Sequence, residues 1–142
     1  MNSSSRFAVS VHVLALLALE ARPVPSAYIA GSVNTNPVVI RRILALLNKA
    51  GFTHSTLGAS GGTTLALPAS RINLLDLYRA VEEPGVLSLH RNSPNPACPV
   101  GRNITSILGG IFEQAQLAME NVIEAMTLQD VLDQLNAAQS PH

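Results

Sequence analysis

Apolar and polar positions in the first fifty residues predict three helices. From about Arg6 to Glu20 nearly every position is apolar, so this first helix must be buried on several sides. Between Ser26 and Lys49 the pattern changes to two short helices, with Gly31 and residues 34–36 as the break between them. Ser26 is the expected N-cap of the first of these helices, while Asn36 and Pro37 suit the N-cap and first turn of the second. Two short helices joined by a tight polar turn predict a helix-turn-helix motif.

The second helix of this motif has two different faces. Its broad apolar face predicts burial of Val39, Ile40, Ile43, Leu44, Leu46 and Leu47. Its outward positions are Val38, Arg41, Arg42, Ala45, Asn48 and Lys49. Cations on the exposed face of a short helix suit a DNA major groove, where Arg binds guanine or phosphate. A solvated amphipathic helix would show the same pattern.

A hairpin is expected directly after this helix. Two β-prone runs, Phe52–Leu57 and Thr63–Leu67, flank a glycine-rich tip. A helix-turn-helix followed by a hairpin is a winged helix, so the fold class is mainly α (α+β). The tip carries no Arg or Lys, which leaves backbone amides, as at Gly61, and the Ser60 hydroxyl as groups that could reach phosphates.

The second half of the chain predicts a linker helix, a long loop and a dimerisation helix. Asn73 caps a helix that ends near Glu82, and residues 84–99 form a long irregular segment. A long helix from Val100 to about Met126 has a coiled-coil-like seam, which predicts a dimer interface at Ile104, Leu108, Ile111, Ala115, Ala118 and Val122. A second apolar stripe comprises Ile107, Phe112, Met119, Ile123 and Met126. One helix with two stripes predicts that one of them faces a second subunit, and the pattern does not decide which.

Beyond the long helix, Thr127 and Asp130 have the spacing of a capping box for a last helix. We expect this helix to span Leu128 to Leu135 and residues 136–142 to fray.

The charged residues are unevenly distributed along the chain. The chain of 142 residues has a formal net charge of zero. Residues 1–71 nevertheless contain six cationic residues, Arg6, Arg22, Arg41, Arg42, Lys49 and Arg71, against Glu20 alone. Residues 72–142 hold the remaining eight acidic residues. This asymmetry suits a basic half that faces phosphates and an acidic half turned away from them.

Cys98 is the single cysteine and stands at the predicted start of the long helix. A helix N-terminus and the nearby Arg102 would both favour the thiolate. We consider two interpretations: a thiol switch, with an intermolecular disulfide among its products, or a buried small hydrophobe. The histidines are scattered, and His90 with Cys98 across a dimer is the one weak metal pattern, so we expect no metal site. A Cys-His enzyme would need an orienting group that the sequence does not indicate, and we expect no enzymatic activity.

Several segments together resemble a known family. They are Ser5–Val9, Thr35–Val38 with Arg41 and Arg42, the glycine-rich wing, Asn73–Glu82 and Cys98–Ile104. In this order they resemble the Rrf-two family of bacterial winged-helix transcription regulators, which includes IscR, NsrR and CymR. The resemblance implies a homodimeric DNA-binding regulator, usually a repressor, that responds to redox, iron-sulfur or metabolic signals. Family members with a cluster hold it with three cysteines in the loop before the long helix. This chain has only Cys98, so we expect no iron-sulfur cluster and no cofactor.

We therefore divide the chain into a DNA-binding region (1–83), a sensor loop (84–99), dimerisation helices (100–137) and a disordered tail (138–142). The expected partners are double-stranded DNA and a second copy of the chain. The expected DNA contacts are Arg6, Ser26, Tyr28, Thr35, Asn36, Pro37, Val38, Arg41, Arg42, Lys49, Ser60 and Gly61, with Thr35 and Pro37 taken from the resemblance. Ser26 and Tyr28 could equally be an ordinary cap and a packing ring.

The expected function is a repressor controlled by the redox state of Cys98. The alternatives are control by a small ligand or protein partner with Cys98 inert, and a winged helix used for protein–protein contact. The first helix is shorter than the ~20 residues of a membrane span, so we expect a cytoplasmic protein without a membrane contact.

Overall fold

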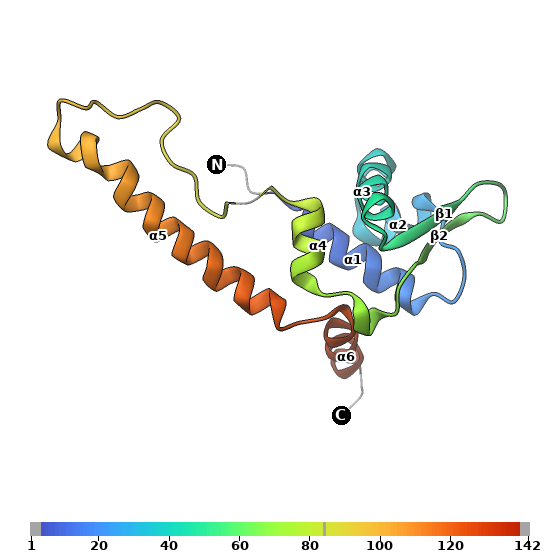
Figure 1. The fold of residues 1–142 in the computed structure, drawn as a ribbon. Helices are drawn as coiled ribbons and strands as arrows, with labels where there is room; N and C mark the ends of the chain where they lie inside the picture. Colours follow the sequence, from blue (N-terminus) through green and yellow to red (C-terminus); the bar gives the residue numbers. More distant parts are fainter. Residues whose placement is uncertain (1–3, 84, 140–142) are drawn as a thin grey trace.

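The computed structural model describes residues 4–83 and 85–139 (Figure 1). Its elements in chain order are α1 (Arg6–Leu19), α2 (Ser26–Val33), α3 (Pro37–Ala50), β1 (Thr53–Thr56), β2 (Gly62–Leu65), the 3-10 helix η1 (Ala69–Arg71), α4 (Leu74–Val81), α5 (Pro99–Glu124) and α6 (Leu128–Gln139). The predicted fold class is confirmed: the chain is mainly helical, with a two-stranded antiparallel wing and a long helix near the C-terminus. Within the described ranges, no helix combines the length and the apolar character needed to cross a membrane.

The core is built around α1, with α2, α3, α4 and α6 packed on it. Fully buried aliphatic side chains come from each of these helices: Leu14, Ile29, Ile40, Leu47, Leu77 and Leu128. Burial of one such side chain stabilises the fold by about 1.5–3 kcal/mol. The expected burial of Val39 on α3 is wrong, since this residue is 39% exposed, and Leu19 at the end of α1 is also exposed, at 58%.

The turn between α2 and α3 confirms one predicted cap and corrects another. Asn36 is the N-cap of α3, and its Oδ1 accepts a hydrogen bond from the Val38 amide at 2.8 Å. Ser26 is not the N-cap of α2, because the carbonyl of Pro25 accepts the first helical hydrogen bond, from the Ile29 amide. Gly31 lies inside α2 and forms no part of the break. The helix ends instead where Asn34 adopts a left-handed conformation, with φ 62°.

The wing is attached to the domain through β2. Strand β1 pairs with β2 in the register Thr53↔Leu65 to Thr56↔Gly62. The backbone of Thr63 also exchanges two hydrogen bonds, of 3.0 and 2.9 Å, with Val24 in the link between α1 and α2. A side chain at Gly62 would lie 2.7 Å from the Val24 backbone, so glycine is required for this close approach. Strand β2 is therefore hydrogen-bonded on both edges, to β1 and to Val24.

Hydrogen bonds connect the start of α4 to the junction between α5 and α6. Asn73 caps α4 through the Leu75 amide at 2.9 Å, and its Nδ2 donates to the Glu124 carbonyl at 2.8 Å. Thr127 and Asp130 form the predicted capping box, with the Thr127 amide 2.9 Å from Asp130 Oδ2. Helix α6 runs to Gln139, so the prediction that it ends at Leu135 and frays from residue 136 is wrong for residues 136–139. The rest of the predicted tail, residues 140–142, lies outside the described residues, as do Pro84 and residues 1–3.

Helix α5 leads away from this domain (Figure 1). Its C-terminal end is the anchored one: Ile123 and the adjoining Met126 pack against the core, and Arg79 of α4 binds Glu120 at 2.8 Å. None of the 26 residues of α5 is buried. The loop that precedes α5 runs beside it to the end of the helix that is remote from the domain (Figure 1), and Cys98 is the N-cap residue at that end.

Candidate nucleic-acid interface

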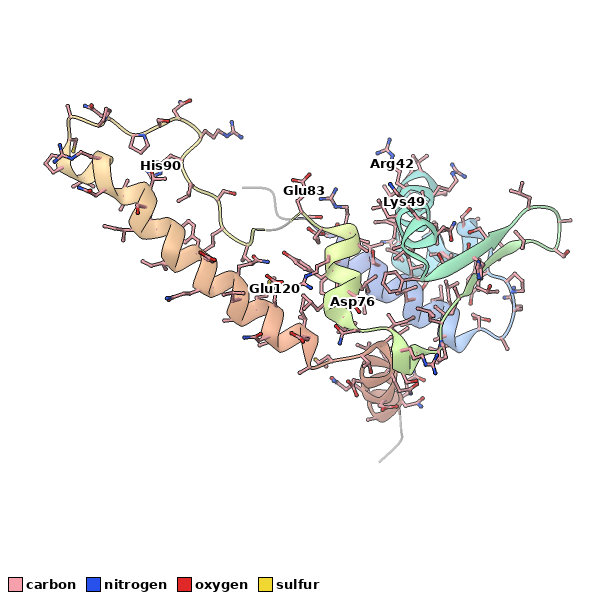
Figure 2. All side chains as sticks on the ribbon, viewed as in Figure 1. Arg42, Lys49, Asp76, Glu83, His90 and Glu120 are labelled. Carbon is pink, nitrogen blue, oxygen red and sulfur yellow. The ribbon has the colours of Figure 1, made fainter. Side chains whose placement is uncertain are left out.

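The outward face of α3 carries three free cations. Arg41, Arg42 and Lys49 are all exposed. Within the part of the chain that the structure describes, ion pairs involve Arg6, Arg22 and Arg79, and none involves a cation of α3. Figure 2 labels Arg42 and Lys49 on α3, apart from Asp76 and Glu120 on α4 and α5. No internal ion pair has to break before these α3 cations can meet phosphate or a base edge.

The N-terminal end of α3 is also open to solvent. Asn36, Pro37 and Val38 are exposed and Thr35 is half-buried. The Asn36 Oδ1 is occupied by its capping bond, which leaves the Nδ2 group as a donor. An exposed helix N-terminus favours an anion such as a DNA phosphate. These four predicted contact residues therefore share one surface with the α3 cations.

Arg6 and Tyr28, two other predicted DNA contacts, interact with acidic residues of their own domain. Arg6 lies 3.8 Å from Glu82, which also accepts hydrogen bonds from Ser4 Oγ and the Phe7 amide, so Arg6 belongs to the corner of α1 and α4. The Tyr28 hydroxyl donates to Glu20 at 3.2 Å, and its ring lies under the Arg22 guanidinium at 5.7 Å. Ser26 is half-buried in the first turn of α2. The structure does not bring Arg6 together with the α3 set.

The tip of the wing offers fewer free hydrogen-bonding groups than its sequence suggested. Ser60 is exposed, whereas the Gly61 amide already donates to the Gly58 carbonyl at 3.0 Å. A side chain at Gly61 would overlap the Thr56 carbonyl, so the glycine is required by the turn itself. Of the two predicted tip contacts, Ser60 retains a free group for phosphate.

Cys98 occupies the predicted N-cap of α5, and it is exposed. The interpretation of Cys98 as a buried hydrophobe is therefore wrong. The amides of Gly101 and then Val100 lower the pKa of the thiol below its ordinary value, and Arg102 is not a cause of this shift. These amides act by hydrogen bonding toward the sulfur at the start of α5, although their geometry falls short of a regular side-chain capping bond. A side chain at Gly101 would overlap the Asn95 carbonyl, so glycine is required where the loop passes the first turn of α5.

Comparison with known proteins agrees with this geometry. Residues 3–134 match the family model Rrf2, which is described as an iron-dependent transcriptional regulator. The chain belongs to the Rrf2 family. It is 43% identical over 132 residues to YwnA of Bacillus subtilis, a candidate HTH-type transcriptional regulator, and the match covers 93% of this chain and 98% of YwnA.

Solved structures of Rrf2 type show the same fold. A candidate transcriptional regulator from Lactobacillus plantarum is 34% identical, with a TM-score of 0.81 over 93% of this chain and 90% of that one. A candidate DNA-binding protein is 40% identical, with a TM-score of 0.72 over 90% of this chain and 99% of that one. T. potens IscR, 24% identical, shares the fold with a TM-score of 0.76 over 100% of this chain and 93% of IscR. The Rrf2 relationship identifies a DNA-binding transcriptional regulator and not an enzyme.

The iron named in the Rrf2 description does not fit the residues of this chain. Residues 4–83 and 85–139 contain no group of three or more His, Cys, Asp or Glu side chains placed to hold a metal ion. Cys98, as the single cysteine, supplies one thiolate where a cluster needs several.

The structure also shows a functional candidate that sequence patterns missed. Gln116 of α5 accepts a hydrogen bond from the Val86 amide at 2.8 Å and donates to the Tyr78 hydroxyl at 3.3 Å. It therefore connects the loop after α4 to α4 itself. No pattern could have revealed this, because its partners lie 30 and 38 positions away in the sequence.

Proposed function

We propose that this Rrf2 protein represses transcription as a homodimer on a pseudo-palindromic operator, with α3 of each subunit in a major groove. The single observation that carries the proposal is that Arg41, Arg42 and Lys49, on the second helix of the motif, are exposed and form no ion pair with any residue that the structure describes. Two such helices related by a two-fold axis would meet half-sites about one helical turn, or a multiple of it, apart.

The open side of α5 supports a dimer. Ile111 and Val122 of the predicted seam are 53% and 65% exposed, although both are large and apolar. In the second stripe, Ile123 and Met126 already pack against the core of their own subunit. The second stripe is covered at its C-terminal end, although its Ile107 is 58% exposed, whereas the seam is open from Ile111 to Val122. We therefore assign the partner subunit to the seam. A contiguous exposed apolar stripe of this kind marks an interaction surface.

Cys98 supports control by oxidation. Its thiol is exposed, and the lowered pKa increases the thiolate fraction, which is the form that oxidants attack. Formation of a sulfenic acid or a mixed disulfide would place a larger group on the first turn of the dimerisation helix. Through α5 such a change would alter the spacing of the two α3 helices.

A second form of control is favoured by two hollows. One, of about 420 Å³, lies between α1, α2 and α6 and is lined mainly by apolar side chains, with His12 and Ser32 on its wall. The other, of about 440 Å³, lies between residues 85–89 and α5. Either could hold a small effector, and in that case Cys98 would be inert. For either form of control, we infer that the protein acts in the cytoplasm, where a bacterial regulator meets its DNA.

Selection of binding sites from random double-stranded DNA tests the proposal. Reduced protein should enrich one palindromic site, and fluorescence anisotropy should show that Arg41→Glu abolishes the binding. Mild oxidation should weaken wild type and spare Cys98→Ser. Binding that is insensitive to oxidation in both would favour an effector instead. Transcription in vitro from a promoter that carries the selected site should fall when reduced protein is added, and a rise would contradict repression. Absence of any enriched site would refute the proposal and favour a protein–protein role.

A further inference from the structure

Asn48 stands on the outward face of α3 in the position of a base-reading residue. It is exposed and lies seven positions after Arg41, which is two helical turns along the same face. An Asn at such a position recognises adenine by using both its Oδ1 and its Nδ2 atoms. Its exposure and place in the motif would therefore suggest direct contact with a base.

Both atoms of this amide are already in use. Asn48 Oδ1 accepts a hydrogen bond from Thr53 Oγ1 at 2.5 Å, and Nδ2 donates to Ser55 Oγ at 3.0 Å. Ser55 Oγ lies a further 2.9 Å from Thr63 Oγ1. Thr53 and Thr63 are only 2% and 3% exposed. Each of the two atoms keeps one further hydrogen-bonding site, but turning the amide toward adenine would break these bonds and leave the buried Thr53 hydroxyl without a partner, which is costly.

This network joins α3 to both strands at the base of the wing. Other contacts at the base are made by the backbone, from Phe52 to Leu47 and from Thr63 to Val24. Beyond the network the tip is free, and Leu57 is 100% exposed. The tip lies about four residues past Ser55, or ~13 Å at ~3.3 Å per residue. A tilt of ~10° at the base would therefore move the tip by ~2 Å, enough to break a hydrogen bond to DNA.

We propose that Asn48 is a positioning residue that fixes the angle of the wing relative to α3, and that it does not read a base. The inference rests on the proposed binding of α3 to DNA, which it deepens. Asn48 supports the contacts that the wing makes with the DNA backbone, so its loss weakens all sites alike.

The first test needs no DNA. Amide hydrogen exchange of the free protein, followed by NMR, compares wild type with Asn48→Ala and with the control Gln129→Ala, an exposed amide on α6 that binds Asp133 of its own helix. Exchange at the amides of β1 and β2 should accelerate about 5- to 10-fold in Asn48→Ala, the factor that corresponds to one net hydrogen bond, while α1 stays unchanged. The control should leave the wing as it is in wild type. Unchanged exchange in the wing of Asn48→Ala would overturn the inference.

The second test uses the operator selected with wild-type protein. Hydroxyl-radical footprints should lose protection under the wing in Asn48→Ala and keep it under α3. The loss of affinity should be equal on a panel of single-base operator variants, and Ser55→Ala should add little to it, because both changes break the same network. Relaxed preference at one base pair, with additive losses, would show that Asn48 reads a base and would overturn the inference.

The two tests separate the inference from the function on which it rests. If wild-type protein binds no DNA, the proposed function fails, and the exchange experiment alone decides whether Asn48 holds the wing. If wild type binds and the footprint of Asn48→Ala is unchanged, the inference fails while the function stands.

Discussion

Removal of the Arg42 guanidinium should change how DNA affinity depends on salt. Arg42 is exposed and makes no ion pair among the described residues, so Arg42→Ala breaks no internal contact and should leave the fold intact. The proposed dimer presents this side chain twice. If each copy neutralises one phosphate, the slope of log K against log salt should become shallower by ~1.8, at ~0.9 per phosphate contact.

This slope has a measurable consequence. Between 50 and 200 mM salt, wild type should lose ~12-fold more affinity than Arg42→Ala, so the two binding curves converge as salt rises. If Arg42 instead reads guanine, the slope should change little, and about 1–3 kcal/mol of discrimination per half-site should disappear at one base pair. Anisotropy titrations of the selected operator at four salt concentrations distinguish these outcomes.

Arg91→Ala is the matched control, because it removes the same charge from the exposed loop before α5. An equal change of slope in both variants would mean that only the net charge matters. Unchanged affinity and unchanged slope in Arg42→Ala would refute the assignment of this face of α3 to the groove.

Three further predictions concern stability, assembly and the thiol. Asn36→Ala removes the cap on the Val38 amide and should lower the free energy of unfolding by ~1 kcal/mol, or the Tm by ~3 °C, in thermal unfolding followed by circular dichroism; an unchanged Tm would contradict the capping role. Ile111→Glu places a charge on the open seam and should shift the dimer to monomer in sedimentation velocity, whereas Gln114→Glu, exposed on the same helix, should not; a dimer that survives Ile111→Glu would exclude the seam as the interface. Alkylation of Cys98 by iodoacetamide should have its pH midpoint lower in the folded protein than in urea, because the folded pKa is depressed; by linkage this group contributes stability above its unfolded pKa, and the contribution is lost as pH falls through the folded pKa. Equal midpoints in the two states would show that the amides do not act on the thiol.

Elements whose interactions lie within a few residues were predictable from the sequence. Asn36 and Asn73 cap helices because their side chains reach amides two positions further on. Thr127 and Asp130 form their box across three positions for the same reason. The hairpin follows from β-prone runs around glycines that permit the turn. In each case the energy that decides the structure is local, so the pattern is sufficient.

Tertiary structure decided the features that depend on distant partners. Arg6 joins Glu82, 76 positions away, and is thereby separated from the basic face of α3. Pro25, and not Ser26, is the N-cap residue of α2. The extended link before α2 pairs with the wing through Val24, and it thereby places the Pro25 carbonyl where the first amides of the helix donate to it. Neither outcome could be predicted from the sequence pattern, because the spacing of polar residues does not indicate which distant charge or carbonyl group each of them will contact.

The two apolar stripes of α5 separate most clearly what the sequence determines from what tertiary packing decides. By itself the sequence determined that this long helix has more apolar surface than one small domain can cover. Only the tertiary structure decided that Ile123 and Met126 turn toward their own core and that Ile111 and Val122 remain open. The physical reason is that burial is a property of the packed chain: the hydrogen bonds at Asn73 and Thr127 orient the C-terminal end of α5 on the domain, and this orientation decides which apolar face is covered.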